Sequence, residues 1–163
     1  MSAARLQTIF IGVGNPFRGD DGVGIAVLQL IRPKIPSDVK VVEETGDGVE
    51  LLEVWKDADR VILVDAVQSG APPGTIHRID ARSEKLPRWF SHSSTHAFGI
   101  AEAIELARTM NELPASVIIY GIVGLDFSAG TALSPEVAQV VPKAAQQVLR
   151  EILAMPLASS SRP

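Results

Sequence analysis

The segment that most constrains the fold is an uninterrupted apolar run, Val61–Val64, which is followed directly by Asp65. The run shows no alternation of apolar and polar residues, so a strand formed here must be buried on both faces. Central strands of parallel sheets have this character, because helices cover both faces of such a sheet. The run therefore predicts an α/β protein with Asp65 at the carboxyl end of a central strand.

Segments of two kinds alternate along the rest of the chain. Short β-branched runs predict strands over 8–13, 39–43, 60–65, 75–81 and 117–123. Apolar residues at three- and four-residue steps predict helices over 23–31, 49–55, 97–110 and 135–155. Alternation of this kind produces parallel βαβ units, so we expect a three-layer α/β sandwich with a mostly parallel sheet flanked by helices. The strand over 75–81 could lie antiparallel at an edge, and Asp20 or Asp21 is expected to cap the first helix.

The length of 163 residues corresponds to one domain, expected over residues 1–156, with a frayed, disordered tail over 157–163. The chain has no cysteine, which excludes disulfide scaffolds, thiolate zinc sites, iron–sulfur clusters and cysteine nucleophiles. Its net charge of −4 argues against a nucleic-acid partner. No export signal is visible, and no apolar run approaches the ~20 residues of a membrane-spanning helix. We therefore expect a cytoplasmic protein with no membrane partner.

A glycine-rich stretch after the first predicted strand matches a phosphate-binding loop only in part. Gly12 and Gly14 fit the dinucleotide fingerprint G-x-G-x-x-G, but Phe17 stands at the third glycine position. Asp20 and Asp21 would also repel a pyrophosphate. The chain lacks the Walker lysine motif, the G-x-S-x-G elbow of serine hydrolases and the H-E-x-x-H motif of zinc proteases. Nucleotide binding and these hydrolase classes are not expected.

Two of the three histidines have the spacing of a helical metal site, because His92 and His96 are four residues apart. The residues between them, Ser-Ser-Thr, disfavour a helix. We expect His96 to be ordered at a helix start and His92 to lie in a loop. His77 has polar neighbours in a predicted strand and is expected to be solvated.

The acids at strand ends remain as candidates, because ligands of open parallel sheets bind beyond the carboxyl ends of the strands. An aspartate at the mouth of a buried strand, such as Asp65, needs a partner. The plainer interpretation is that backbone amides or an arginine satisfy it, and the alternative is a metal ligand. With Asp21 and His96 it would supply two carboxylates and one imidazole, a set that suits nickel or zinc and leaves coordination positions open.

At these residues the chain resembles the hydrogenase maturation endopeptidases, from about Ile9 to Leu153. The resemblance is carried by short motifs in a fixed order. They are Gly12-Val-Gly-Asn15, Asp20-Asp-Gly-Val-Gly24, Val64-Asp-Ala66, Ser94-Thr-His96 with Gly99, and Leu133-Ser-Pro-Glu136.

The resemblance implies a twisted five-stranded sheet and an enzyme that removes the C-terminal peptide of a nickel–iron hydrogenase large subunit after nickel insertion. It assigns the metal-binding and catalytic positions to Asp21, Asp65 and His96. It implies Ni²⁺ carried by the immature large subunit, with zinc or cadmium able to occupy the same position. Reading of the substrate's C-terminus would fall to Glu43 or Asp47, in a segment where the family's Gly-Thr order is transposed.

Two other functions compete with this hypothesis. A nickel-binding chaperone that inspects the large subunit without cutting it would use the same ligands. A peptidyl-tRNA hydrolase also opens with a strand and a Gly-Asn-Pro turn, but it needs a tyrosine and a histidine that residues 17–24 lack. The acidic net charge further disfavours a tRNA substrate.

Overall fold

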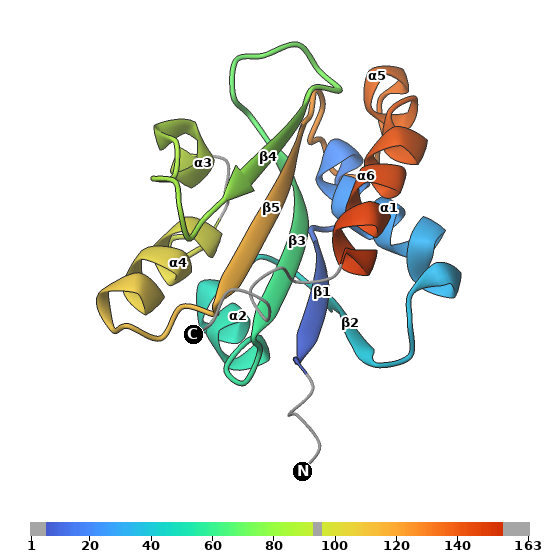
Figure 1. Ribbon diagram of the computed structural model, residues 1–163. Helices are drawn as coiled ribbons and strands as arrows, with labels where there is room; N and C mark the ends of the chain where they lie inside the picture. The colour runs from blue at the N-terminus through green and yellow to red at the C-terminus, as the bar shows by residue number, and fades with distance from the viewer. Residues whose placement is uncertain (1–5, 93–95, 155–163) are drawn as a thin grey trace.

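The structure is a computed structural model that describes residues 6–92 and 96–154. One sheet has the strand order β2-β1-β3-β5-β4 (Figure 1). The strands are β1 (Thr8–Val13), β2 (Val39–Glu44), β3 (Arg60–Val67), β4 (Ile76–Asp80) and β5 (Ser116–Val123). All neighbours pair in parallel except β4, which runs antiparallel to β5 at one edge. The predicted α/β sandwich with a mostly parallel five-stranded sheet is confirmed.

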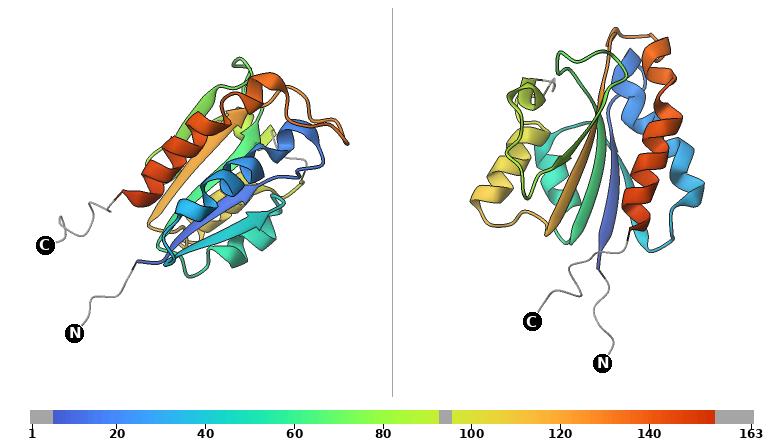
Figure 2. Two further views of the ribbon diagram at one scale, coloured as in Figure 1. Left: turned by 90° about the vertical axis from the view of Figure 1, so that its right-hand side faces the viewer. Right: turned by 45° about the horizontal axis from the view of Figure 1, so that its top comes forward.

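Helices cover both faces of the sheet (Figures 1 and 2). One face carries α1 (Val23–Ile31), α5 (Pro135–Ala138) and α6 (Val141–Leu153). The opposite face carries α2 (Gly48–Val54), α3 (Arg88–His92) and α4 (Ile100–Thr109). Two short 3₁₀ turns flank α1, namely η1 (Gly19–Gly22) and η2 (Arg32–Lys34).

The apolar strands occupy the centre of the sheet because their residues feed two cores at once. Alternate residues of a strand point to opposite faces. In β3, Leu63 packs in the core under α2 and α4, whereas Ile62 packs in the core under α1 and α6. The edge strands β2 and β4 are only partly buried. Val61–Val64 shows no alternation of apolar and polar residues because both faces of β3 are buried, as predicted.

Some boundaries differ from those predicted. The central strand continues beyond Asp65 to Val67, because Ala66 and Val67 still pair with β5. Asp65 therefore lies inside β3, although the pairing of β3 with β1 stops one residue earlier, at Val64. The helix predicted over 135–155 is two helices, α5 and α6. Proline near the N-terminus of each suits a helix start, where the missing N–H has no helical acceptor to lose.

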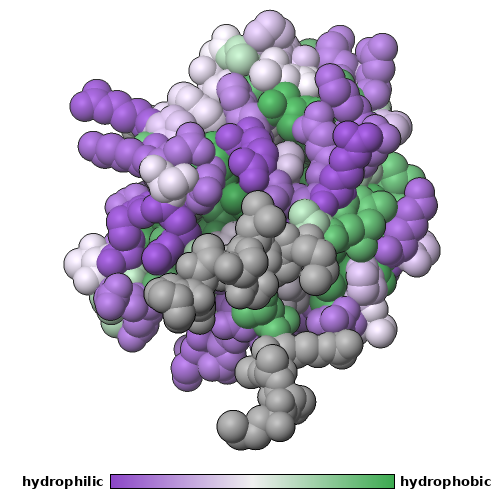
Figure 3. Space-filling view, viewed as in Figure 1, coloured by the Kyte–Doolittle hydropathy of each residue, from purple (hydrophilic) through white to green (hydrophobic). Residues whose placement is uncertain are grey.

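No element was predicted between the strand over 75–81 and the helix over 97–110, but the structure has the short helix α3 there. His92 ends this helix, so its expected position in a loop is wrong. The predicted tail over 157–163 lies outside the described residues. No helix within the described ranges is both long and apolar enough to cross a lipid bilayer. On the face shown in Figure 3, polar side chains predominate and apolar ones lie between them.

Candidate functional site

The candidate site lies where the chain reverses its direction of travel across the sheet. From β1 the chain passes through α1 to β2 at one edge, and from β2 it returns through α2, on the opposite face, to β3. Strands β1 and β3 are neighbours, and their pairing ends at Gly12 and Val64. Such a switch point opens a crevice at the carboxyl ends of the two strands, where ligands of α/β proteins bind.

A pocket of about 460 Å³ occupies this crevice. Its walls come from the loop after β1, from η1, from the loop after β2 and from the segment before α4. Its lining residues are Gly14, Asn15, Pro16, Phe17, Arg18, Asp21, Thr45 and His96. Two of the three predicted site residues, Asp21 and His96, therefore face one pocket although they are far apart in the sequence.

Asp21 is held by the turn that connects β1 to η1. Its Oδ2 accepts a hydrogen bond of 2.9 Å from the backbone N–H of Asn15. The turn requires glycine at position 14, because its φ is +136° and a Cβ there would lie 1.8 Å from the carbonyl oxygen of Asp21. The close approach of backbone to backbone fixes where the Asp21 carboxylate enters the pocket.

Gly24 sets the start of α1 against the same crevice. A Cβ at this position would lie 2.3 Å from the carbonyl oxygen of Val13 and 2.5 Å from that of Val64. Both distances are far below van der Waals contact, so only glycine lets the helix begin directly above the ends of β1 and β3.

Asp65 lies two residues after the core residue Leu63, and residues two apart in a strand point to the same face. Asp65 therefore extends from β3 on the face covered by α2 and α4. Its Oδ1 accepts a hydrogen bond of 2.8 Å from the backbone N–H of Ala66. Burial raises the pKa of Asp65 well above its ordinary value, and the negative charge of Asp21 raises it further. The two carboxyl groups therefore form an interacting pair. Within the described residues Asp65 has no arginine partner. Of the partners expected in the plainer interpretation, backbone amides or an arginine, Asp65 therefore has one, the amide of Ala66.

His96 reaches the pocket from the segment before α4. Its Nε2 lies 3.2 Å from the carbonyl oxygen of Thr45. A carbonyl oxygen can only accept, so this contact places a proton on Nε2. A Cβ at position 46 would lie 3.4 Å from the Cδ2 atom of His96. The loop after β2 thus supports the imidazole ring through its backbone.

The donor types at this crevice suit a divalent metal, but they are not assembled into a closed coordination shell. No three His, Asp or Glu side chains in the described part of the chain lie close enough together to hold a metal ion. Asp21 interacts with Asp65 and shares a pocket with His96. The assignment of Asp21, Asp65 and His96 as metal ligands and catalytic residues stays a prediction.

Asp20 does not cap a helix, contrary to one of the two predictions for this turn. Its carboxylate is completely buried and accepts hydrogen bonds from the backbone N–H groups of Leu125, Asp126 and Ser134 and from the Ser134 hydroxyl. These donors lower its pKa, although burial alone would raise it. Asp20 therefore ties the loop after β1 to the loop after β5. Asp21 does not cap α1 either, because the residue at the N-cap is Gly22.

The predicted substrate-binding residues Glu43 and Asp47 are outside the pocket lining. Glu43 pairs with Arg32 at 3.3 Å on the surface. Asp47 caps α2 by accepting hydrogen bonds from the backbone N–H groups of Val49 and Glu50. Their role in reading a substrate stays a prediction, and the structure gives each side chain a local partner.

His77 is more enclosed than expected for a solvated residue. Its Nε2 lies 2.9 Å from the Ser69 hydroxyl, and its ring centroid lies 4.8 Å from that of Trp89. The expectation failed because α3, which supplies Trp89, was not predicted.

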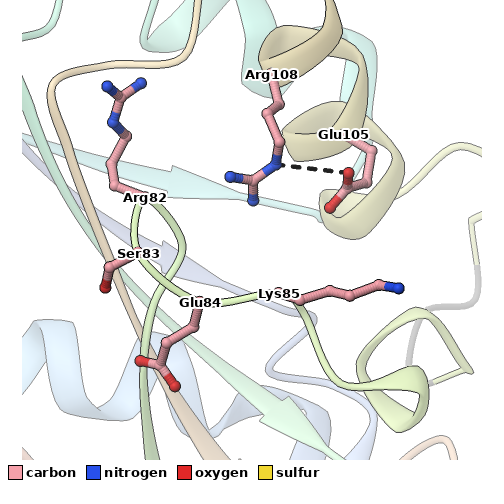
Figure 4. Close-up of a pocket in the computed structure, with 6 residues that line it drawn as sticks. All are labelled: Arg82, Ser83, Glu84, Lys85, Glu105 and Arg108. Atoms are coloured by element: carbon pink, nitrogen blue, oxygen red, sulfur yellow. Dashed lines mark ion pairs between the residues drawn. The ribbon is translucent and has the colours of Figure 1, made fainter.

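A second pocket, of about 370 Å³, lies at the opposite end of the sheet (Figure 4). It follows the C-terminal end of β4, which pairs with the start of β5. Its charged residues belong mainly to the segment after β4 and to α4, where Arg108 pairs with Glu105 at 3.6 Å. It contains no histidine and lies away from the carboxyl ends of the parallel strands. We therefore do not take this second pocket as the candidate functional site.

Thr45 follows the second predicted strand among polar residues that could line a site, but its backbone contact with His96 and the place of Phe17 in the pocket were not predicted. Thr45 contributes its carbonyl oxygen to His96, and no side-chain pattern signals a backbone contact. Phe17 lines the pocket. In the sequence it was noted only because it replaces the third glycine of the dinucleotide-binding motif.

Comparison with known proteins gives a consistent result over most of the chain. A family profile described as hydrogenase maturation protease matches residues 26–151. The hydrogenase 2 maturation protease of Escherichia coli K12 is 26% identical over 148 residues, covering 88% of this chain and 89% of the relative. A putative hydrogenase maturation protease of Methanocaldococcus jannaschii is 31% identical over 155 residues, covering 91% and 97%.

Solved structures agree on the fold. The E. coli hydrogenase maturating endopeptidase HybD superposes with a TM-score of 0.74 at 22% identity, covering 96% of this chain and 94% of that one. The HybD protease of Thermococcus kodakarensis gives a TM-score of 0.68 at 21% identity, covering 90% and 99%. Since the family profile spans most of the chain and a full-length relative exceeds 30% identity, the chain belongs to the hydrogenase maturation protease family.

Proposed function

We propose that this protein is an endopeptidase that removes the C-terminal extension of a nickel–iron hydrogenase large-subunit precursor after nickel insertion. The observation that carries the proposal is the pocket at the switch point of the sheet, which Asp21 and His96 line and beside which the charge of Asp21 raises the pKa of Asp65. Membership of the family supports the proteolytic activity. The name of the E. coli relative, hydrogenase 2 maturation protease, supports the class of substrate.

The carboxyl pair supports binding of a cation. Two neighbouring carboxylates repel one another when both are ionised, and either a proton or a metal ion relieves the repulsion. Nickel accepts carboxylate and imidazole ligands. In this proposal Asp21, Asp65 and His96 bind the Ni²⁺ that the precursor carries, and zinc or cadmium can occupy the same side chains.

In this proposal the ion arrives with the substrate and is not a resident cofactor. A precursor without nickel would lack one anchor and would bind more weakly. The enzyme would then discriminate between nickel-loaded and nickel-free precursor by the difference between its affinities for the two forms. Nickel in this scheme serves as a recognition element, and the reaction takes place in the cytoplasm, where the precursor is made.

The same carboxyl pair can supply acid–base chemistry. An ionised aspartate accepts a proton from a water molecule as that water attacks the scissile carbonyl carbon. The proton then passes to the leaving nitrogen as the peptide bond breaks. In the free protein, the raised pKa of Asp65 supports this residue as the member of the pair that holds a proton, which a bound cation would displace.

The experiment incubates the full chain with nickel-loaded and nickel-free precursor and follows the intact mass of the precursor. We expect loss of the C-terminal peptide from the nickel-loaded form alone. Equal trimming of both forms would reject nickel as a recognition element. Nickel-dependent binding without loss of mass would instead identify a non-cleaving chaperone.

A further inference from the structure

Phe17 is the most solvent-exposed large apolar side chain among the described residues, with 78% of its surface accessible. Water contact with a phenyl ring of this size is unfavourable, at about 25 cal/mol per Å² of apolar area. Single exposed apolar side chains are common on protein surfaces, so exposure alone assigns no role to Phe17. What distinguishes Phe17 from the other exposed apolar residues is its place in the wall of the pocket that Asp21 and His96 line.

The backbone around Phe17 is fixed on both sides. Its N–H donates to Asn15 Oδ1 at 2.9 Å, and its carbonyl oxygen accepts from the N–H of Gly130 at 2.7 Å. The N–H of Gly19 donates to the carbonyl oxygen of Thr131 at 3.0 Å. The ring is thus presented on an anchored turn instead of collapsing onto the core.

The ring also belongs to the candidate site. Phe17 lines the same pocket as Asp21 and His96, and it stands on the loop that positions Asp21. The buried carboxylate of Asp20 joins this loop to the loop after β5, whose Leu125 is 56% exposed. The pocket therefore combines polar groups at the carboxyl ends of the strands with an apolar group on its rim.

We propose that Phe17 determines substrate affinity by packing against an apolar side chain of the precursor polypeptide, next to the bond that is cut. This inference rests on the proposed function, because it identifies the occupant of the pocket as that substrate. A chain segment that brings its peptide bond to Asp21 has to pass the rim. Contact with the ring would remove apolar surface from water on both partners.

The experiment compares Phe17→Ala, Phe17→Leu and the control Met110→Ala, which removes a side chain 54% exposed at the end of α4. The assay measures KM and kcat for the nickel-loaded precursor, together with direct binding of that precursor. We expect Phe17→Ala to raise KM and the dissociation constant about tenfold or more, the effect of losing one buried apolar side chain. We expect kcat to change little, Phe17→Leu to restore most of the affinity, and the control to match the wild type.

Several results would overturn the proposal. One is an unchanged KM and dissociation constant for Phe17→Ala, and another is an equal effect from Met110→Ala. Loss of self-association in Phe17→Ala without any change in precursor binding would make a second copy of this chain the partner. If the wild-type protein binds the precursor without trimming it, the proposed function fails, while a weaker binding of Phe17→Ala still supports the contact.

Discussion

Two aspartates at the same end of the sheet differ in how their carboxyl groups are satisfied, since Asp20 is completely buried and Asp65 is partly buried. Asp20 accepts three backbone N–H groups and one hydroxyl, and its pKa is lowered. Asp65 accepts one N–H and lies near the charge of Asp21, and its pKa is raised. A buried carboxylate whose oxygens all accept hydrogen bonds is compatible with a stable fold. A carboxyl group with few hydrogen-bond donors and a raised pKa is typical of a functional site. The comparison gives Asp20 a structural role and supports the proposal that Asp65 takes part in the reaction.

The largest effect is expected for Asp65→Asn. Loss of the carboxylate should reduce the rate of precursor trimming by roughly 10²- to 10⁴-fold, the contribution of a general acid or base. The free energy of unfolding should stay the same or increase, because the substitution removes the repulsion from Asp21. Intact-mass kinetics and urea unfolding measure the two effects separately.

The matched control for this change is Asp57→Asn, which alters an exposed carboxylate just beyond α2. It should leave both measurements near those of the wild type. Trimming by Asp65→Asn at a near-normal rate would contradict the assignment of Asp65 to chemistry.

The next effect concerns Asp20→Ala, which should lower the free energy of unfolding by about 3 kcal/mol or more. The substitution would leave the buried N–H and hydroxyl of Ser134 and the partly buried N–H groups of Leu125 and Asp126 without their acceptor. Urea unfolding checks it against Asp126→Ala, since the Asp126 side chain is exposed and accepts hydrogen bonds only from nearby Ser128, and the substitution keeps the backbone N–H that Asp20 accepts. A loss below about 1 kcal/mol for Asp20→Ala would show that this carboxylate does not anchor the loops.

The two aspartates should also give different pH dependences of stability. Because the pKa of Asp20 is lowered, its stabilisation is present above the ordinary carboxyl pKa and is lost as pH falls through its lower folded value. Because the pKa of Asp65 is raised, ionised Asp65 destabilises the fold, and this cost disappears as pH falls through its higher folded value.

The measurement is urea unfolding of wild type, Asp20→Asn and Asp65→Asn from about pH 8 to about pH 3. Any stability advantage of Asp65→Asn should vanish in mild acid. The penalty of Asp20→Asn should persist there and decline only in stronger acid. Parallel pH profiles for the two variants would erase the distinction between the two aspartates.

The smallest effect on stability is expected for Glu43→Gln. Its ion pair with Arg32 is about half exposed, so its loss should cost less than about 1 kcal/mol. The variant Arg32→Gln breaks the same pair from the other side. If Glu43 reads the substrate, KM should rise in Glu43→Gln alone. An equal change in both variants would mean that the ion pair acts only on local structure.

Much of the fold follows from local patterns in the sequence. The all-apolar segment Val61–Val64 predicted a central strand, and alternation of strands and helices predicted the layers. The partner of Asp21 could also be anticipated in outline, because β1 and β3 end at the same edge of the sheet. These features depend on the periodicity of apolar residues, which a single segment reveals.

Other features depend on contacts between distant segments, which no local pattern reveals. The donors to Asp20 lie more than 100 residues away along the chain, so a capping role was the natural interpretation of that acid. The enclosure of His77 by Trp89 depends on α3, a helix too short to show periodicity. The support of His96 by the Thr45 carbonyl involves the backbone alone.

The backbone contact at Gly24 has a consequence for how such a protein can diverge. Any side chain at that position would collide with the ends of β1 and β3, so the base of the crevice cannot vary. Phe17, a few residues earlier, projects into solvent and can be exchanged with little loss of folding energy. A duplicated copy could therefore alter the rim of the pocket while the backbone at the base of the crevice stays the same.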